Sequence, residues 1–362
     1  MRVILKLGTS TLSGSDGLPC RERLRGYAAA LAELRAGGHQ PLIVSSGAVA
    51  CGRARLGWAG GSVIEKQQLA AVGQPLLMRF WEEALATQDL VCAQILLTRA
   101  DLERRRGYLN ARSTLLGLLA RGVVPVVNEN DTVATEEIRL GDNDTLSARV
   151  AALTEADLLI LLTDREALYE RDPAVDPKAQ PIREVGPGPI PEAVRRAASA
   201  AGGRFGTGGM ATKLEAALLA RRAGVRVVIA SGGDPRTVLR IAEGEAIGTC
   251  FHPEEETLAA RKRYLLALTP AGRLHVDPGA ARALSEGRSL LTVGLMRVEG
   301  AFERGDAVSI LAPGGAELAR GLVNYDAEDL ARLCGRRSQE IARLLGYHYG
   351  DEAVHRDHLV ML

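Results

Sequence analysis

Lysine is scarce in this chain, and two of its lysines lie beside glycine-rich turns. Only five lysines occur among 45 basic residues, so a retained lysine marks a position where a compact point charge is useful. Lys6 lies in a short apolar run just before Gly8, and Lys213 closes the segment GTGGMATK at residues 206–213. An ammonium group beside exposed backbone N–H groups binds phosphate well. Both positions therefore predict an anion site, with a surface lysine and a flexible linker as the plain alternatives.

Asparagine and aspartate cluster in two short segments, NEND at residues 128–131 and GDND at residues 141–144. Three of the chain's five asparagines lie there. Both residue types are common in turns, which is the plain explanation. However, one cluster follows a buried apolar run and the other opens a helical pattern. Together they offer acceptors for an ammonium and amide donors for a carboxylate, so the pattern favours a site for a small molecule with a carboxylate or an amine.

Two further junctions carry polar residues where an apolar run ends. Ser45 and Ser46 precede Gly47 in the segment VSSGA, and a helical pattern follows. Unpaired N–H groups at a helix N-terminus favour anions, although a serine there is also an ordinary N-cap. Thr163 and Asp164 end another apolar run, where they could meet a nucleotide, with a helix cap as the alternative role for Asp164.

Strand-like and helix-like segments alternate through the first two-thirds of the chain. Apolar runs predict strands at residues 3–7, 41–44, 90–97, 123–127, 157–163 and 225–230. Helical patterns lie between them, for example at residues 21–36, 64–86, 108–121 and 210–223. This order predicts an α/β fold with a mostly parallel open sheet sandwiched by helices. Ligands bind such sheets outside the carboxyl ends of the strands, which is where the polar junctions fall.

The sequence changes in character after residue 252. Residues 253–268 are charged and predict a linker between a larger domain at residues 1–252 and a smaller one at residues 269–362. Strands are expected at residues 289–298, 307–311 and 318–323, followed by a helix at 326–345 with Gly335 as an interruption. This part is therefore expected to form a small β-rich domain.

Composition excludes several classes of protein. The 362 residues are 46% hydrophobic and 25% charged, as in ordinary globular chains, and the net charge of +1 predicts no polyanionic partner. The five cysteines are scattered without a C-x-x-C pair, so neither a disulfide framework nor a zinc site is expected. No signal peptide or membrane span is predicted, and a reducing cytoplasm is the expected location.

Taken together, the motifs KLGTS, VSSGA, NEND, GDND, LLTD and GTGGMATK, with SQEIARLLGY and AVHRDHL near the end, are specific. Over essentially its whole length the chain resembles the glutamate 5-kinases of the amino acid kinase family, including members with a C-terminal PUA domain. The resemblance implies an ATP site made of Lys6, Thr163, Asp164, Thr207, Gly208, Gly209, Met210, Ala211, Thr212 and Lys213. It implies a glutamate site made of Ser46, Asn128, Asp131, Asp142 and Asn143.

The resemblance also implies a reaction, transfer of the γ-phosphoryl group of ATP to the glutamate side-chain carboxylate, with Mg²⁺ carried by ATP. Lys6 and Lys213 are the expected catalytic cations, because the acceptor is already anionic and the difficulty is charge repulsion. Asp144 is expected to orient the lysines or hold metal-bound water, and Asp131 to pair with the substrate ammonium. Proline is expected to act as a feedback inhibitor, and the chain is expected to form a dimer or tetramer. The reductase that consumes the product is an expected partner.

Two other functions stay open on the sequence. Another amino acid kinase would act on acetylglutamate, aspartate or a nucleotide monophosphate. An RNA-binding role would use the arginines of the C-terminal part, namely Arg332, Arg336, Arg337 and Arg343. A solvated helix face is the favoured explanation of those arginines.

Overall fold

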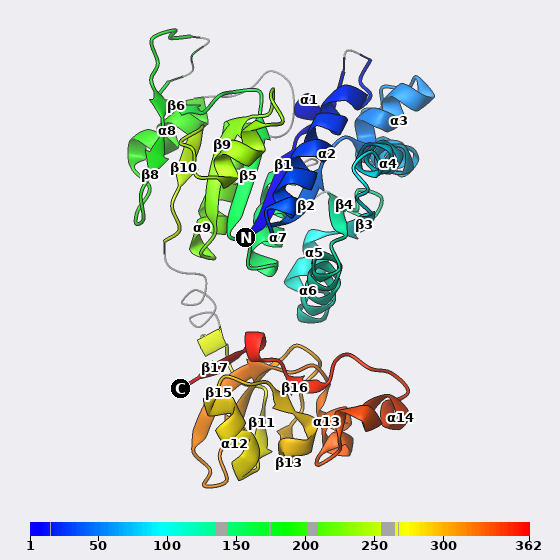
Figure 1. Cartoon of the computed structure of the whole chain (residues 1–362), viewed down its shortest axis with the longest axis vertical. Helices are drawn as coiled ribbons and strands as arrows, with labels where there is room; N and C mark the ends of the chain where they lie inside the picture. The colour runs from blue at the N-terminus through cyan, green and yellow to red at the C-terminus, as the bar shows by residue number, and fades with distance from the viewer. Residues whose placement is uncertain are drawn as a thin grey trace. The chain divides into compact units, whose positions relative to one another are not determined.

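The computed structural model describes residues 1–14, 16–134, 143–171, 173, 175–200, 209–254, 265–266 and 268–362. The chain divides into two compact units, residues 1–103 with 110–257 and residues 104–109 with 258–362 (Figure 1). Most of the predicted linker lies outside the described residues, so the boundaries at residues 252 and 269 stay predictions.

The first unit is built on an eight-stranded sheet. Its strands are β1 (Arg2–Leu7), β2 (Gln40–Ser45), β3 (Cys92–Leu97), β4 (Val124–Glu129), β5 (Leu158–Thr163), β8 (Glu184–Val185), β9 (Arg226–Ser231) and β10 (Thr249–Phe251). They are ordered β3-β4-β2-β1-β5-β9-β10-β8, and β9 with β10 is the antiparallel pair. The predicted mostly parallel sheet is therefore confirmed. Strands β6 (Leu168–Tyr169) and β7 (Pro181–Ile182) form a separate antiparallel pair.

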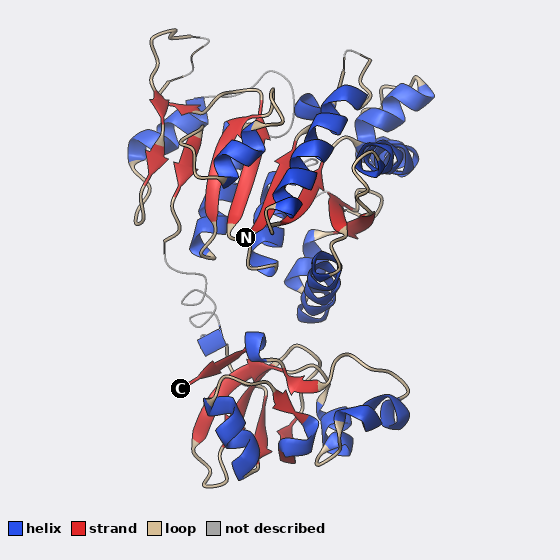
Figure 2. Ribbon diagram, in the orientation of Figure 1, coloured by secondary structure: helices blue, strands red, loops and turns tan. Residues whose placement is uncertain are grey.

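Helices cover both faces of this sheet (Figure 2). They are α1 (Thr9–Leu12), α2 (Arg21–Ala36), α3 (Ala48–Leu56), α4 (Val63–Ala86), α5 (Arg99–Glu103), α6 (Arg105–Ala120), α7 (Asn143–Leu153), α8 (Glu192–Ala200), α9 (Met210–Arg222) and α10 (Thr237–Ala242). Apolar residues of α2, α4 and α10 share one core with Leu5 and Leu7 of β1. Side chains alternate across a strand, so Lys6 points to the opposite face, where α7 packs against β1 and α9 against α7.

The central strands are buried on both faces, which explains their continuous apolar runs. Every residue of β5 is buried, as are Val3 to Leu7 in β1. The long helix α4 begins at a capping box, in which the Ser62 hydroxyl accepts from the Glu65 N–H and the Glu65 carboxylate accepts from the Ser62 N–H. The sequence thus fixes both the sheet layer and the start of the helix.

The second unit contains a five-stranded sheet in the order β13-β11-β14-β15-β17 and a separate pair, β12 with β16. Its elements are β11 (Gly272–Val276), α12 (Pro278–Ser285), β12 (Leu290–Leu291), β13 (Leu295–Gly300), β14 (Ala307–Leu311), β15 (Glu317–Leu322), α13 (Ala327–Leu333), α14 (Ile341–Leu345), β16 (Glu352–Val354) and β17 (Leu359–Met361). One apolar core, which includes Leu274, Ile310 and Leu330, lies inside this unit. The predicted small β-rich domain is confirmed.

Two elements of the second unit differ from the predictions. A 3₁₀ turn at Thr292–Gly294 divides the strand predicted at residues 289–298 into β12 and β13. The interruption predicted at Gly335 in the helix at residues 326–345 is confirmed, but it is longer than one residue. Helix α13 ends at Leu333, because Cys334 leaves the helical conformation and Gly335 has a φ of 70°, and α14 begins only at Ile341. Within the described part of the chain, no helix is long and apolar enough to cross a membrane.

Candidate active site

The predicted site residues gather where the central strands of the first unit end. Lys6 lies near the end of β1, Thr163 at the end of β5 and Asn128 near the end of β4, while Ser46 directly follows β2. Parallel strands bring these carboxyl ends to one edge of the sheet, as the sequence predicted. The Ser46 N–H donates to the Leu7 carbonyl oxygen over 3.0 Å and so ties the ends of β1 and β2 together.

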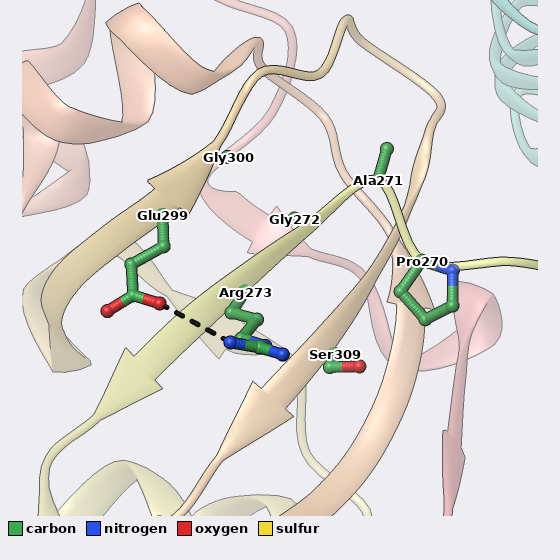
Figure 3. A pocket seen from close by; sticks show the side chains of 7 residues that line it. All are labelled: Pro270, Ala271, Gly272, Arg273, Glu299, Gly300 and Ser309. Carbon is green, nitrogen blue, oxygen red and sulfur yellow. Dashed lines mark ion pairs between the residues drawn. The ribbon is translucent and has the colours of Figure 1, made fainter.

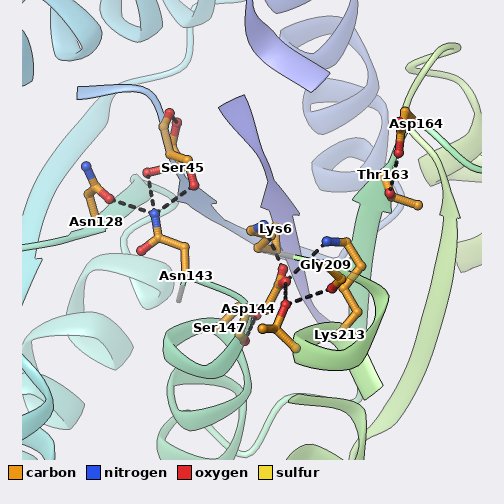
Figure 4. Close-up of polar contacts among 12 residues, drawn as sticks. Lys6, Ser45, Asn128, Asn143, Asp144, Ser147, Thr163, Asp164, Gly209 and Lys213 are labelled. Carbon is orange, nitrogen blue, oxygen red and sulfur yellow. Dashed lines mark hydrogen bonds and ion pairs between the residues drawn. The ribbon is translucent and has the colours of Figure 1, made fainter. Parts of the chain in front are cut away.

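The two predicted catalytic lysines meet at one carboxylate. Lys6 Nζ lies 2.6 Å from Asp144 Oδ1, and Lys213 Nζ lies 3.2 Å from Asp144 Oδ2 (Figure 4). All three side chains are buried, and Asp144 is completely so. Two ammonium groups and one carboxylate leave this cluster with a net positive charge, which suits an anionic ligand such as a phosphate.

Asp144 stays ionised in this environment. Burial by itself would raise the pKa of its carboxyl group, but the charges of Lys6 and Lys213 and hydrogen bonds from Lys6 and Thr212 hold that pKa below its ordinary value. The Thr212 hydroxyl lies 2.9 Å from Asp144 Oδ2. The ionised carboxylate therefore holds the two lysines in place.

Two members of this cluster lie in the first turns of helices, Asp144 in α7 and Lys213 in α9. Asp144 follows Asn143 at the start of α7, where an acidic residue interacts favourably with the helix dipole. Lys213 lies in the first turn of α9, whose N-cap residue Gly209 provides no side-chain cap. The N–H groups of Met210 and Ala211 at this helix start are the kind of donors that phosphate oxygens accept from.

A second cluster is made of side-chain amides. Asn143 Nδ2 donates to Asn128 Oδ1 over 2.9 Å and to Ser46 Oγ over 2.8 Å. The same nitrogen lies 3.4 Å from the Ser45 carbonyl oxygen. Asn143 is 4% exposed, and its Oδ1 has no hydrogen-bond partner among the described residues. The site thus presents a buried acceptor, one of the two kinds of group that the NEND and GDND segments predict.

The turn after β2 depends on one glycine. Gly47 has a φ of 119°, in the left-handed region, and directly precedes α3. Gly8, at the end of β1, has a φ of −78° that any residue adopts. Of the two turns, the one that carries Ser46 therefore has the stricter requirement for glycine.

Asp131 lies just beyond β4 and is partly buried. Burial raises the pKa of its carboxyl group to about 6. A carboxylate of this kind gains stability from an incoming cation, since the charge removes the cost of ionising it in a poorly hydrated place. This environment suits the predicted contact with an ammonium group.

The remaining predicted residues are less connected. Thr163 Oγ1 donates to Asp164 Oδ1 over 3.0 Å. Asp164 is exposed and precedes a bend, so it caps no helix. Thr207, Gly208 and Asp142 lie outside the described residues.

Sequence reasoning missed two side chains of α4 that touch the site. Gln74 Oε1 accepts from Asn128 Nδ2 over 2.8 Å, and Trp81 Nε1 donates to Ser45 Oγ over 2.9 Å. A glutamine within the apolar stretch of a buried helix was the available signal for Gln74. A tryptophan in an apolar helix is usually a core residue, so nothing in the sequence indicates that Trp81 contacts the site.

The described residues do not form a metal site by themselves. No group of three or more acidic, histidine or cysteine side chains in the described ranges could hold an ion. Both carboxylate oxygens of Asp144 are already engaged by lysines.

A surface pocket of about 380 Å³ lies in the second unit (Figure 3). Arg273 and Glu299 line it 3.9 Å apart, and Ser309 donates to Glu317. Its polar groups thus satisfy one another. Among the C-terminal arginines, Arg332 and Arg343 are paired with Asp329 and Glu340, which favours a solvated helix face over a phosphate-binding patch.

Comparisons with known proteins agree with this architecture. Residues 1–231 match the amino acid kinase family, and residues 272–345 match the PUA domain. These two matches correspond to the sheet with its polar edge and to the smaller β-rich unit.

Full-length relatives are similar across both units. A protein named glutamate 5-kinase from Deinococcus radiodurans is 51% identical, with 100% of each chain covered. Proteins of the same name from Thioalkalivibrio sulfidiphilus and Geobacter sp. strain M21 are 50% and 47% identical, each covering 100% of this chain and 97% of its own.

Proposed function

This chain belongs to the amino acid kinase family, and we propose that it transfers the γ-phosphoryl group of ATP to the side-chain carboxylate of glutamate, the first step of proline synthesis. Relatives that carry the name glutamate 5-kinase cover its whole length at about half identity. The observation that carries the proposal is the pair of buried lysines held on Asp144 beside the amide cluster.

The lysine pair answers the chemical difficulty of this reaction. A carboxylate nucleophile is already ionised at neutral pH, so no side chain has to remove a proton. It must instead approach an anionic phosphoryl group, and preorganised positive charge lowers that barrier. Lys6 and Lys213 reach Asp144 from two different elements, and in the proposed mechanism they flank the transferred group. Asp144 acts by fixing both ammonium groups and takes no proton.

The amide side of the site recognises the other end of the substrate. Among the described residues, Asn143 Oδ1 is a buried acceptor without a donor, and Asp131 is a partly buried carboxylate. An α-ammonium group satisfies both. The Ser46 hydroxyl accepts from Asn143, so its own hydrogen remains for a substrate carboxylate. Acetylation of the amine would remove the charge and leave these acceptors unpaired, which sites of this kind reject strongly.

ATP is proposed to enter as its Mg²⁺ complex. Mg²⁺ is bound through substrate phosphates in many kinases and keeps several of its waters. The N-terminus of α9, together with Lys213, Thr212 and the residues before them, is the proposed phosphate-binding segment. Thr163 and Asp164 are proposed to contact the nucleotide at the end of β5.

Several partners follow from the same proposal. Proline is proposed to inhibit by competing at or near the glutamate site, and the chain is proposed to assemble as a dimer or tetramer. The acyl phosphate product is labile in water, so a reductase that consumes it is the proposed next partner. All five cysteines are free, which supports a reducing location such as the cytoplasm.

The proposal is tested with a panel of acceptors in a coupled assay for ADP release. Glutamate is expected to be turned over at least a hundredfold more efficiently than N-acetylglutamate, aspartate or UMP. Turnover of any of these three at the rate of glutamate would assign the chain to another branch of the family.

A further inference from the structure

A chain of three buried amide side chains crosses the amide side of the site. Gln74 Oε1 accepts from Asn128 Nδ2 over 2.8 Å, and Asn128 Oδ1 accepts from Asn143 Nδ2 over 2.9 Å. Their exposed fractions are 9%, 2% and 4% in that order. Each amide in this relay is therefore held by its neighbour rather than by water.

Backbone groups fix the direction of the relay. The Glu129 N–H donates to Asn128 Oδ1 over 2.9 Å, so Asn128 must turn its NH₂ group toward Gln74. The carbonyl oxygen of Ser45 lies 3.4 Å from Asn143 Nδ2, which fixes the second amide. An N–H can only donate and a carbonyl oxygen can only accept, so neither amide can be reversed without losing a hydrogen bond.

The two ends of the relay are unpaired. Asn143 Oδ1 and Gln74 Nε2 are buried and have no hydrogen-bond partner among the described residues. An unpaired buried polar atom is costly, and a native protein keeps one where a ligand or another function requires it. Asn143, which carries the oxygen at one end of the relay, donates through its Nδ2 to Ser46 Oγ, in the proposed glutamate site.

Helix α4 holds Gln74 rigidly against the substrate turn. A Cβ atom on the adjacent Gly73 would lie 1.8 Å from the Ala48 carbonyl oxygen, and one on Gly52 would lie 2.0 Å from the Leu69 carbonyl oxygen. Helices α3 and α4 therefore touch backbone to backbone, and α3 begins directly after the turn that carries Ser46. Gln74 is thus fixed relative to the elements that bind the substrate.

We propose that Gln74 is a positioning residue for substrate recognition, which acts through Asn128 to hold the Asn143 carbonyl oxygen toward the substrate ammonium. This inference rests on the proposed function. Gln74 supplies the acceptor for the Asn128 NH₂ group, and without it that buried group loses this hydrogen bond, so Asn128 holds Asn143 less firmly, although the backbone contacts remain. The effect falls on recognition of the ammonium and leaves phosphoryl transfer itself intact.

The experiment compares the wild-type chain with Gln74→Met, Asn128→Ala and the double variant. Gln74→Met is expected to raise the glutamate KM about tenfold, the effect of one buried hydrogen bond, with kcat and the ATP KM within twofold. The inhibition constant of glutarate, which lacks the ammonium, is expected to stay within twofold. In the Asn128→Ala background, Gln74→Met is expected to raise the glutamate KM by less than a further twofold, because Gln74 acts through the Asn128 side chain, which is absent there.

The matched control is Gln68→Met, at an exposed position of the same helix, and it is expected to leave every constant unchanged. An equal effect of Gln74→Met in both backgrounds, or an equal loss for glutamate and glutarate, would overturn the inference. If Gln74→Met does not fold by circular dichroism, Gln74→Asn, whose shorter side chain cannot reach Asn128, replaces it with the same expected constants. An inactive wild-type chain would contradict the proposed function instead, so the two failures are distinguishable.

Discussion

Lys6 Nζ lies 2.6 Å from Asp144 Oδ1, and this contact joins the end of the central strand β1 to the first turn of α7. The same carboxylate holds Lys213 from the first turn of α9. Three elements that lie far apart in the sequence thus meet at one anion. The arrangement keeps two positive charges in a fixed place before any substrate arrives, which is the condition for electrostatic stabilisation of phosphoryl transfer.

Removal of one lysine is expected to slow the chemical step. Lys213→Ala should lower kcat on the order of a hundredfold or more, with a modest change in the glutamate KM, because the ammonium acts on the transferred group. Steady-state kinetics with both substrates varied measure this. An unchanged kcat would remove Lys213 from the catalytic machinery.

Removal of the shared anion is expected to affect both stability and rate. Asp144→Asn leaves two buried ammonium groups without their partner, which costs about 3–5 kcal/mol in buried pairs of this kind. Thermal unfolding should show a lower Tm, and added sulfate should restore part of it by binding between the lysines. Glu83→Gln is the control. Like Asp144, Glu83 contacts two cationic side chains, here two arginines, but it does so at the surface, where loss of the charge should change Tm little.

The pH dependence of this stability has a definite sign. The pKa of Asp144 is lowered in the folded protein, so its contribution is full above the unfolded pKa of about 4 and is lost as pH falls through the folded value. The Tm difference between wild type and Asp144→Asn should therefore shrink in acid. A difference that grew below pH 4 would contradict the assignment of charge.

Asp131 is expected to make glutamate binding depend on pH. Burial raises the pKa of this carboxyl group to about 6 in the ligand-free protein, and only the ionised form attracts an ammonium. The glutamate KM should be constant above pH 7 and should rise about tenfold per unit below pH 6. Asp131→Asn should raise the KM at neutral pH and abolish this slope. A slope that persisted in the variant would point to another titrating group.

The two turns beside the site should respond differently to alanine. Gly47→Ala places a side chain at a φ of 119°, which costs on the order of 1–2 kcal/mol and displaces Ser46, so Tm should fall and the glutamate KM should rise. Gly8→Ala meets no such strain, since φ is −78° and an added Cβ would lie 3.5 Å from Lys6 Nζ. Equal losses of Tm in both variants would contradict this distinction.

The sheet and the lysine pair could be predicted from the sequence for physical reasons. Strands buried on both faces require continuous apolar runs, so Val3 to Leu7 and residues 158–162 stand out, and a lysine within such a run is conspicuous. The carboxyl ends of parallel strands must meet at one edge, which predicts that Lys6, Asn128 and Thr163 lie along that edge.

Other features were hidden because they depend on tertiary contacts. The sequence does not show that the Asn143 NH₂ group donates to Asn128 and Ser46, because these contacts join residues of different elements. Gln74 lies more than fifty residues before Asn128 and Asn143 in the chain, and no spacing rule connects a helix interior to a strand end. In the second unit, the short strands β16 and β17 carry too few residues to show a period.

The central claim is transfer of a phosphoryl group from ATP to the glutamate side-chain carboxylate, and trapping of the product tests it most directly. The purified chain is incubated with ATP, Mg²⁺, glutamate and hydroxylamine, and the hydroxamate is identified by mass spectrometry. The account predicts γ-glutamyl hydroxamate in proportion to ADP, and none with N-acetylglutamate or without ATP. Release of ADP with glutamate but without any hydroxamate would contradict it.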